Sequence, residues 1–501
     1  MILDFQYVSK KILISEIDDN GDIKMNYYPW RQPKKYVSCS SSDPDKHPKY
    51  TTWDRKPVKV VDTNVPNRFS IYEFLDRLPS DEKERLFAYK EPKIYFVDIE
   101  TEILDSGFVE PVDANSKVLT IAIVHKNKTL VLGLKPLEQK EINRVKNNLE
   151  NHFEKFNLKV DFKYISFHDR ENPEKDMMEY FFEKLVPKMP VISGWNFLDY
   201  DWTFLINRCR KIGIKPEISS FSGRLEKIFG TPYEVPNHRL IIDYMEIYKK
   251  WDTSIKVKES NSLNWVGEKV LDLEHGAKIQ YSGTLMDLYR DDFTKYVFYN
   301  AVDTVLVQLI HEKMQYINIA YSISNLAKIR LNDFAIKNLN CSLVITEGFL
   351  RENFREQENI VFTKEDEDVD AESIAGGWVK TPAKGMNEWV TTFDFSSLYP
   401  RTQMMFNIAP ETFMGYVMKD KPTHCDFDGK ITEIDDEKHI ICVNGAVFNR
   451  GKSVTIDFLK SVFAERKRFK KMMGVELKKY DTMNRELNLM KEELKELKSQ
   501  R

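Results

Sequence analysis

The stretch Lys93-Ile-Tyr-Phe-Val-Asp-Ile-Glu-Thr101 decides how the surrounding chain folds. Its β-branched, aromatic and apolar residues predict a buried strand. Asp98 and Glu100 interrupt this strand, and residues two apart point to the same face. Two ionised, unpaired carboxylates are costly on a hydrophobic element, and a divalent cation offsets that cost because hard cations take carboxylate oxygens. The alternative is a strand end at which both acids reach water.

Composition limits the class of protein. The chain has 501 residues, which predicts about three or four domains. The formal net charge is −3, so any basic surface is local. The five cysteines are scattered without a C-x-x-C spacing, which favours free thiols in a reducing compartment. There is no signal-peptide pattern at the start and no apolar run near the ~20 residues of a membrane span. We therefore expect a cytoplasmic protein with no membrane partner.

Strand patterns alternate with helical patterns around this stretch, which predicts an α/β domain with a mixed sheet. The expected strands are 117–124, 129–132 and 191–194, and the expected helices are 80–89, 176–185 and 201–212. Residues 296–350 are mainly helical, and the acid-rich segment 363–372 is typical of a linker. Residues 389–395 predict another strand that ends in an acid, and 457–501 predict one long helix, weakened at Gly474.

Three acidic motifs follow one another: Asp98-Ile-Glu100, Gly194-Trp-Asn-Phe-Leu-Asp-Tyr-Asp201 and Tyr299-Asn-Ala-Val-Asp303. Helix positions four apart share a face, so Tyr299 and Asp303 are expected to point into one site. Four carboxylates are enough for two hard cations, and two metals about 3.5–4 Å apart can activate water and hold the leaving oxygen in phosphodiester hydrolysis. Taken alone, Asp201 is typical of an acid that caps a helix. Tyr299 and Asp303, taken alone, are typical of a pair on an ordinary helix surface.

Together and in this order, the motifs resemble D-x-E, N-x(2-3)-[FY]-D and Y-x(3)-D of the DEDDy proofreading 3′–5′ exonucleases, over residues 93–320. The resemblance implies an RNase H-like domain that binds two Mg²⁺ ions, with Mn²⁺ as a substitute. It implies that Asp98, Glu100 and Asp201 hold the metals and that Asp303 completes the site. Tyr299 and Glu100 would orient the attacking water. Asn196 would contact the 3′ end of a DNA strand, although a lone Asn is equally a turn residue.

A second motif, Phe393-Asp-Phe-Ser-Ser-Leu-Tyr-Pro400, resembles D-x-x-S-L-Y-P of the family B DNA polymerases, and Asn407-Ile-Ala-Pro-Glu411 resembles its continuation in enzymes of the T-even phage type. The resemblance implies that Asp394 and Phe395 belong to a catalytic metal set. It also implies that the incoming nucleotide is contacted by Ser397, Leu398, Tyr399, Arg466 and Lys470. DNA would be contacted by Gly376 and Gly377. A solvated basic face is the alternative for Arg466 and Lys470.

The match has departures. Arg401 replaces the usual Ser, Ile374 replaces a Tyr before the two glycines, and residues 400–501 contain neither D-T-D-S nor K-x(3)-N-S-x-Y-G. We therefore expect the N-terminal part of a family B polymerase, which binds primer–template DNA and dNTP in the cytoplasm of an infected bacterial host. A separate C-terminal chain would complete it, and a sliding clamp would bind only through that chain. The alternatives are a catalytically inactive module that binds DNA or proteins, and an engineered or incomplete fragment.

The expected domains are an N-terminal domain (1–92, with 321–368 returning to it), the exonuclease (93–320), the first part of the palm (369–452) and half of the fingers (453–501). In the last segment Met473, Tyr480, Leu487 and Leu494 recur every seven residues. This spacing predicts a stripe that packs along another helix, with a self-associating coiled coil as the alternative.

Overall fold

The structure is a computed structural model. It describes the chain apart from residues 1, 9–10, 30–33, 63–73, 76–77, 105–106, 108, 229–230, 253–257, 274–276, 280, 282, 328–349, 352, 362, 364–379, 382–383, 387, 418–422, 426–430 and 500–501. Contacts divide it into two compact units. Unit 1 comprises Met1–Pro33 and Thr63–Phe349, and unit 2 comprises Lys34–Asp62 and Leu350–Arg501. The finer division into four domains stays a prediction.

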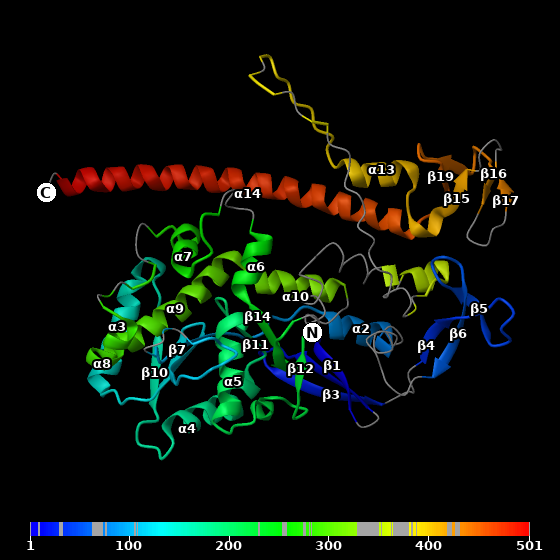
Figure 1. The fold of residues 1–501 in the computed structure, drawn as a ribbon. Helices are drawn as coiled ribbons and strands as arrows, with labels where there is room; N and C mark the ends of the chain where they lie inside the picture. The colour runs from blue at the N-terminus through cyan, green and yellow to red at the C-terminus, as the bar shows by residue number, and fades with distance from the viewer. Residues whose placement is uncertain are drawn as a thin grey trace. The chain divides into compact units, whose positions relative to one another are not determined.

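Unit 1 is built on a six-stranded mixed sheet with the order β10-β9-β8-β7-β11-β14. Figure 1 labels four of these strands, β7, β10, β11 and β14. Its strands are β7 (Ile94–Thr101), β8 (Val118–His125), β9 (Lys128–Gly133), β10 (Asp161–Ser166), β11 (Val191–Gly194) and β14 (Leu240–Asp243). β7, β8 and β9 pair antiparallel, whereas β10, β11 and β14 join in parallel. The predicted strands 117–124, 129–132 and 191–194 are confirmed as β8, β9 and β11, and the mixed α/β fold class is confirmed.

Helices cover both faces of this sheet. The helices of unit 1 are α2 (Ser80–Phe87), α3 (Gln139–His152), α4 (Pro173–Glu179), α5 (Thr203–Lys211), α6 (Tyr244–Trp251), α7 (Leu263–Leu271), α8 (Leu285–Asp291), α9 (Phe293–Met314) and α10 (Tyr316–Leu326). On one face Ile94 and Phe96 of β7 pack with α9, and on the other Val97 and Ile99 pack with α4 and α5. Because successive side chains of β7 point to opposite faces of the sheet, Asp98 and Glu100 lie on the same face as α9.

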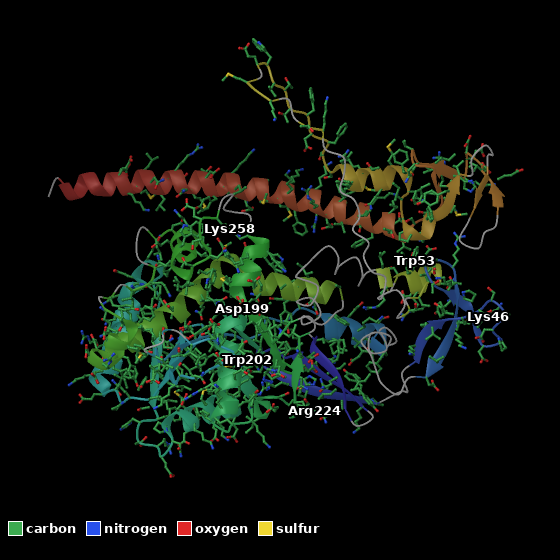
Figure 2. All side chains as sticks on the ribbon, viewed as in Figure 1. Lys46, Trp53, Asp199, Trp202, Arg224 and Lys258 are labelled. Atoms are coloured by element: carbon green, nitrogen blue, oxygen red, sulfur yellow. The ribbon has the colours of Figure 1, made fainter. Side chains whose placement is uncertain are left out.

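Short helical turns extend several of these helices. They are η1 (Glu154–Phe156), η2 (Tyr180–Leu185), η3 (Val186–Lys188), η4 (Leu198–Trp202) and η5 (Pro216–Ser219). The predicted helix 201–212 begins earlier than expected, because η4 leads directly into α5. The Leu198 backbone N–H donates to Asp243 Oδ2 at 3.1 Å, so a side chain from the end of β14 caps this turn. Asp199 is exposed and Trp202 is buried in the core (Figure 2).

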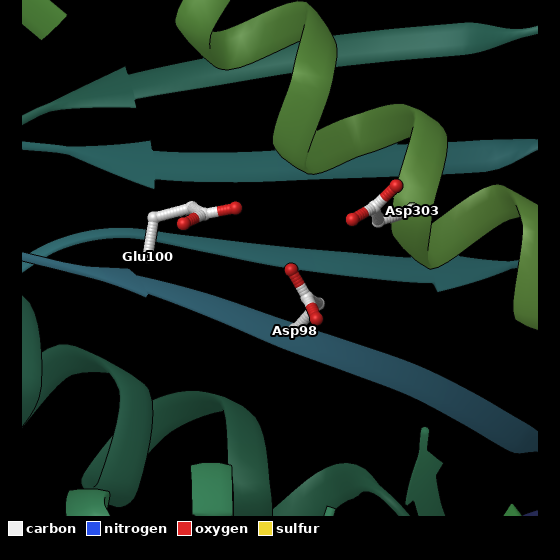
Figure 3. Close-up of side chains that lie close together, drawn as sticks. All are labelled: Asp98, Glu100 and Asp303. Carbon is white, nitrogen blue, oxygen red and sulfur yellow. The ribbon is translucent and has the colours of Figure 1, made fainter. Parts of the chain in front are cut away.

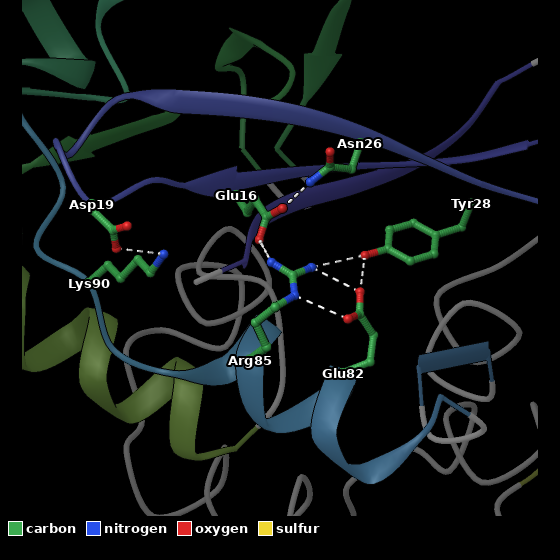
Figure 4. A network of polar contacts seen from close by, with 7 residues as sticks. All are labelled: Glu16, Asp19, Asn26, Tyr28, Glu82, Arg85 and Lys90. Atoms are coloured by element: carbon green, nitrogen blue, oxygen red, sulfur yellow. Dashed lines mark hydrogen bonds and ion pairs between the residues drawn. The ribbon is translucent and has the colours of Figure 1, made fainter.

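Smaller sheets complete unit 1. The strands β1 (Ile2–Val8), β2 (Lys11–Ile17) and β3 (Ile23–Pro29) form an antiparallel meander, and β12 (Leu225–Lys227) pairs with β13 (Glu234–Pro236). Arg85 of α2 ties its helix to the meander, because its guanidinium contacts Glu16 at 2.8 Å and Glu82 at 2.9 Å (Figure 4). Tyr28 donates to Glu82 at 2.6 Å. The Arg85 guanidinium and this hydroxyl lower the pKa of Glu82 to about 2.

Unit 2 contains two small sheets and a long helix. One sheet has the order β4-β6-β5, from β4 (Lys34–Ser38), β5 (Lys46–Thr51) and β6 (Pro57–Asp62). The other has the order β17-β16-β15-β19-β18, from β15 (Phe413–Val417), β16 (Thr423–Cys425), β17 (Ile431–Glu433), β18 (His439–Ile441) and β19 (Ala446–Asn449). The helical elements are η6 (Phe354–Glu358), α13 (Leu398–Phe406), η8 (Pro410–Thr412) and α14 (Val454–Ser499).

The long C-terminal helix is confirmed. α14 runs for 46 residues and passes through Gly474 without a break. No helix in the described part of the chain is both long and apolar enough to cross a bilayer.

Candidate active site

Three carboxylates meet between β7 and α9. Asp98 and Glu100 come from the strand and Asp303 from the helix, and Figure 3 shows the three side chains converging. One potential ligand oxygen of each lies within 4.8 Å of those of the other two. Tyr299 and Asp303 share the helix face that is turned toward this point, and both line the same cavity as the two strand acids. The expectation that one site collects these four side chains agrees with the geometry.

Asp201 is placed differently from the other acids. It lies in η4, is 5 % exposed, and accepts a hydrogen bond from the Ile99 backbone N–H at 3.0 Å. That N–H belongs to the residue between Asp98 and Glu100, so Asp201 joins η4 to β7 at the site. It lines the cavity but is not part of the closest group of three.

The acids form one wall of a cavity of about 750 Å³. Asn196, predicted to contact DNA, lines the cavity and has a φ of 59°, so it also forms the turn after β11. Gly194 precedes it, and a Cβ at this position would lie 2.5 Å from the Val97 carbonyl oxygen. The absence of a side chain therefore lets the end of β11 approach β7 closely. Arg290 and Lys278 are the basic residues among the described residues of the lining.

The electrostatics are unfavourable without a cation. Burial, followed by the charge of Asp303, raises the pKa of Asp98 to about 7. Burial and the neighbouring acids also raise the pKa values of Glu100 and Asp201 well above their usual range. Asp303 Oδ1 is buried and has no hydrogen-bond partner within the described structure. Clustered carboxylates with an unsatisfied oxygen suit a hard divalent cation.

Lys278 is a site residue that the sequence did not reveal. Its Nζ lies 2.5 Å from Asp303 Oδ2 and donates to the Tyr299 hydroxyl at 3.4 Å. Burial opposes the charge of Lys278, but Asp303 and Tyr299 outweigh it, so the pKa of Lys278 lies above its usual value. Lys278 lies outside any helix or strand, so no periodic pattern marks it. Asn300 was also missed, although it lies inside the third motif.

Aromatic residues around the motifs serve different purposes. Phe96 and Phe197 are 2 % and 0 % exposed and belong to the core, and neither is among the described residues that line the cavity. Trp195 is half-buried, lines the cavity and donates from Nε1 to the Asn261 carbonyl at 2.9 Å.

Most of the predicted polymerase residues that the structure describes are exposed in unit 2. Residues 390–395 form no strand, because a strand needs a hydrogen-bonded neighbour and the described residues provide none beside them. Asp394, Phe395, Leu398 and Tyr399 are exposed, and Ser397 is half-buried with a φ of 57° directly before α13. Among the described residues, Asp394 belongs to no group of three or more potential metal ligands.

The other predicted contacts of this half are less defined. Arg466 and Lys470 lie exposed on α14. Gly376 and Gly377 lie outside the described residues.

Comparison with known proteins matches two segments of the chain to models of one family. Residues 48–264 match the model of the DNA polymerase family B exonuclease domain, and residues 341–495 match that of DNA polymerase family B. The first match ends before Tyr299 and Asp303, which the fold brings back to the matched acids.

Individual relatives agree with these models. The DNA-directed DNA polymerases of Escherichia phage RB69 and Enterobacteria phage T4 are 25 % and 27 % identical over 314 residues. Each match covers 60 % of this chain and 33 % of the phage protein. A DNA polymerase of Archaeoglobus fulgidus is 25 % identical over 234 residues, which is 44 % of this chain and 27 % of that protein. The chain thus spans about one third of the length of the phage relatives that it matches.

Proposed function

Since the chain belongs to DNA polymerase family B across its two matched segments, we propose that its unit 1 site is a metal-dependent 3′–5′ exonuclease acting on DNA. One observation carries this proposal. Asp98, Glu100 and Asp303 come from elements about 200 residues apart in sequence, yet their oxygens lie within 4.8 Å of one another in a cavity. An RNase H-like sheet that presents acids from a central strand and a covering helix suits phosphodiester hydrolysis.

The side chains fit two divalent cations, Mg²⁺ in the cell and Mn²⁺ as a substitute. Asp98, Glu100, Asp201 and Asp303 would hold them, and the unsatisfied Asp303 Oδ1 supports this assignment. Bound ions supply positive charge that activates a water and neutralises the leaving oxygen. Carboxylate oxygens are the ligands that such hard cations prefer.

The other residues bind and orient. Burial raises the pKa of the Tyr299 hydroxyl, so this group stays protonated at neutral pH and can donate a hydrogen bond to the attacking water. Glu100 would accept from the same water. Asn196 lines the cavity in which the terminal nucleotide would lie, and Arg290 gives that cavity a positive group suited to phosphate.

Unit 2 would contribute part of a polymerase site. We propose that Asp394 and Phe395 bind a catalytic metal, that Ser397, Leu398, Tyr399, Arg466 and Lys470 contact dNTP, and that Gly376 and Gly377 contact DNA. We propose that further acids come from additional polypeptide, supplied by a separate C-terminal chain. A sliding clamp would bind through that chain, in the cytoplasm of an infected bacterial host.

The exonuclease is tested with a single-stranded oligonucleotide labelled at its 5′ end. The purified chain should shorten it stepwise from the 3′ end with Mg²⁺ or Mn²⁺, and EDTA should stop the reaction. An oligonucleotide blocked at its 3′ end is the matched control. DNA binding without shortening would instead support the catalytically inactive binding module.

The polymerase proposal has its own test. On a primed template with dNTP, the 501-residue chain alone should not extend the primer, because residues 400–501 lack the D-T-D-S acid pair and Asp394 belongs to no described group of three potential metal ligands. Template-directed extension by the pure chain would show that the missing acids are present in it.

A further inference from the structure

Asn300 is a buried polar residue next to the acids. It lies on α9 between Tyr299 and Asp303, and its residue surface is 0 % exposed. It is not among the described residues that line the cavity, so it would not touch a substrate there. Any effect of Asn300 on the site must therefore pass through another side chain.

The side chain of Asn300 joins two strands. Its Nδ2 donates to Asp98 Oδ2 at 2.6 Å, and its Oδ1 accepts from the Thr120 hydroxyl at 3.0 Å. Thr120 is buried on β8, directly opposite Glu100 in the β7–β8 ladder. The relay Thr120–Asn300–Asp98 thus links β8, α9 and β7.

The relay has one satisfied arrangement when Asp98 is ionised. An ionised carboxylate only accepts hydrogen bonds, so it must face the NH₂ end of the amide. The amide oxygen then faces Thr120, whose hydroxyl can donate to it. Rotating the amide by half a turn would place its oxygen against the carboxylate oxygen, which is repulsive and leaves both without a donor.

We propose that Asn300, held by Thr120, is a positioning residue that orients the Asp98 carboxylate for binding a divalent cation. The inference rests on the proposed exonuclease function for its biological role. Hydrogen bonds from such outer residues fix the orientation of a ligand, and their loss lowers metal affinity by roughly 10- to 100-fold. A buried partner of Asp98 without this role would affect stability and leave metal affinity unchanged.

Direct metal binding separates the two possibilities. Mn²⁺ titrations of the full chain, followed by the electron paramagnetic resonance signal of free Mn²⁺, report affinity without any reaction. Asn300→Leu keeps the volume and removes the relay, so its Mn²⁺ dissociation constant should rise by about 10- to 100-fold. Thr120→Val should raise it less, and Thr120→Ser, which keeps the hydroxyl, should retain the wild-type value.

Thr304→Val is the matched control. Thr304 is also buried and its hydroxyl donates at 2.8 Å to the backbone oxygen of Asn300, so this variant loses a similar bond but leaves the amide relay intact. It should bind Mn²⁺ like the wild type. Adding Asn300→Leu to Asp98→Ala should cause no further loss of affinity, because the carboxylate on which Asn300 acts is already absent.

Equal Mn²⁺ affinity of wild type, Asn300→Leu and Thr120→Val would overturn the inference. The inference would also be overturned if Asn300→Leu lowered Mn²⁺ affinity by the same factor in the Asp98→Ala background as in the wild type. A wild-type chain that binds Mn²⁺ but does not shorten DNA would refute the proposed function alone, and the positioning role would still be decided by the affinities. A wild-type chain that binds no Mn²⁺ would overturn both.

Discussion

Lys278 and Asp303 form an ion pair inside the acid site, with Lys278 Nζ 2.5 Å from Asp303 Oδ2. The Asp303 side chain is 6 % exposed and that of Lys278 is 30 % exposed, so the pair is partly shielded from water. Lys278 also lowers the pKa values of Asp98 and Glu100, against the larger effect of burial. In the metal-free protein it therefore offsets part of the charge that a cation would otherwise neutralise.

Lys278→Met should destabilise the metal-free protein by about 2–4 kcal/mol, because removing one partner leaves a buried charge uncompensated. The loss should shrink in saturating Mg²⁺, since a bound cation takes over the same role. Thermal unfolding in EDTA and in Mg²⁺ measures both values. Lys313→Met breaks the exposed pair with Asp272 and should cost less than about 1 kcal/mol in either buffer. An equal effect of the two variants would contradict this prediction.

Asp98→Ala combined with Glu100→Ala should abolish the metal-dependent shortening of DNA. The two acids share one face of β7 at the centre of the site, so their removal eliminates two of the three acids in the closest group. The variant should remain folded and should unfold in EDTA at or above the wild-type temperature, because the repulsion between buried acids is relieved. Asp161→Ala, which removes an exposed acid from β10, is the matched control. Nuclease activity in the purified double variant would refute the site.

Tyr299→Phe should slow hydrolysis and leave DNA affinity almost unchanged. The ring and its packing against Tyr281 are kept, and only the hydroxyl is lost. An interaction that matters mainly in the transition state lowers the single-turnover rate, by about 10-fold or more. Tyr289→Phe removes a hydroxyl from the neighbouring helix α8 and should have no effect. If affinity falls and the rate does not, Tyr299 is a binding residue.

The sequence revealed the acids because their local patterns survive folding. Asp98 and Glu100 alternate with buried residues on a strand, and Tyr299 and Asp303 recur at a helical spacing, so each pair points to one face wherever its element packs. The two pairs are about 200 residues apart in sequence, and only the family resemblance indicated that they come together in one site. Periodicity within each element carries no information on such distant contacts.

The remaining features depend on tertiary contacts. Lys278 reaches Asp303 from a segment without regular structure, and Thr120 appears in sequence as an ordinary strand residue of β8. The start of η4 depends on Asp243, which lies 45 positions after Leu198. The prediction of a strand at 389–395 is wrong for a related reason. Its apolar pattern is compatible with a strand, but the pattern does not show whether a second strand lies beside it to form hydrogen bonds.

The Glu82–Arg85 contact should make stability depend on acid pH. Glu82 has a pKa of about 2 in the folded protein and ~4.3 when unfolded, so its stabilising effect is complete above about pH 5 and is lost as pH falls toward 2. Glu82→Gln should cost about 1 kcal/mol at neutral pH, at the low end for charged hydrogen bonds because the pair is partly exposed. Unfolding curves at several pH values measure the difference, which should disappear near pH 2.

Glu84→Gln is the control for this effect. Glu84 is exposed on the same helix, and its variant should follow the wild type at every pH. A constant difference between Glu82→Gln and wild type from pH 7 to pH 2 would contradict the assigned contact.

The apolar stripe on α14 should bind a helix of another polypeptide. Tyr480, Met483 and Leu487 lie three and four residues apart, so they share one face, and they are 64 %, 68 % and 48 % exposed. Met473 and Met490 extend the stripe and Glu476 interrupts it. The side chains of Leu494 and Leu497 lie outside the described residues. A row of exposed apolar residues along a helix is typical of helix–helix packing.

Met483→Glu combined with Leu487→Glu should abolish polymerase reconstitution with a C-terminal chain that carries the missing acids, because two charges would be buried at the contact. The shortening of DNA that we assign to the unit 1 site should be unchanged. Leu489→Glu is the matched control, since Leu489 is 60 % exposed but lies on the opposite side of the helix. Reconstitution that survives the double change would exclude the stripe as the joining surface. A wild-type chain that sediments as a dimer, and becomes monomeric in the double variant, would show instead that the stripe pairs with a second copy.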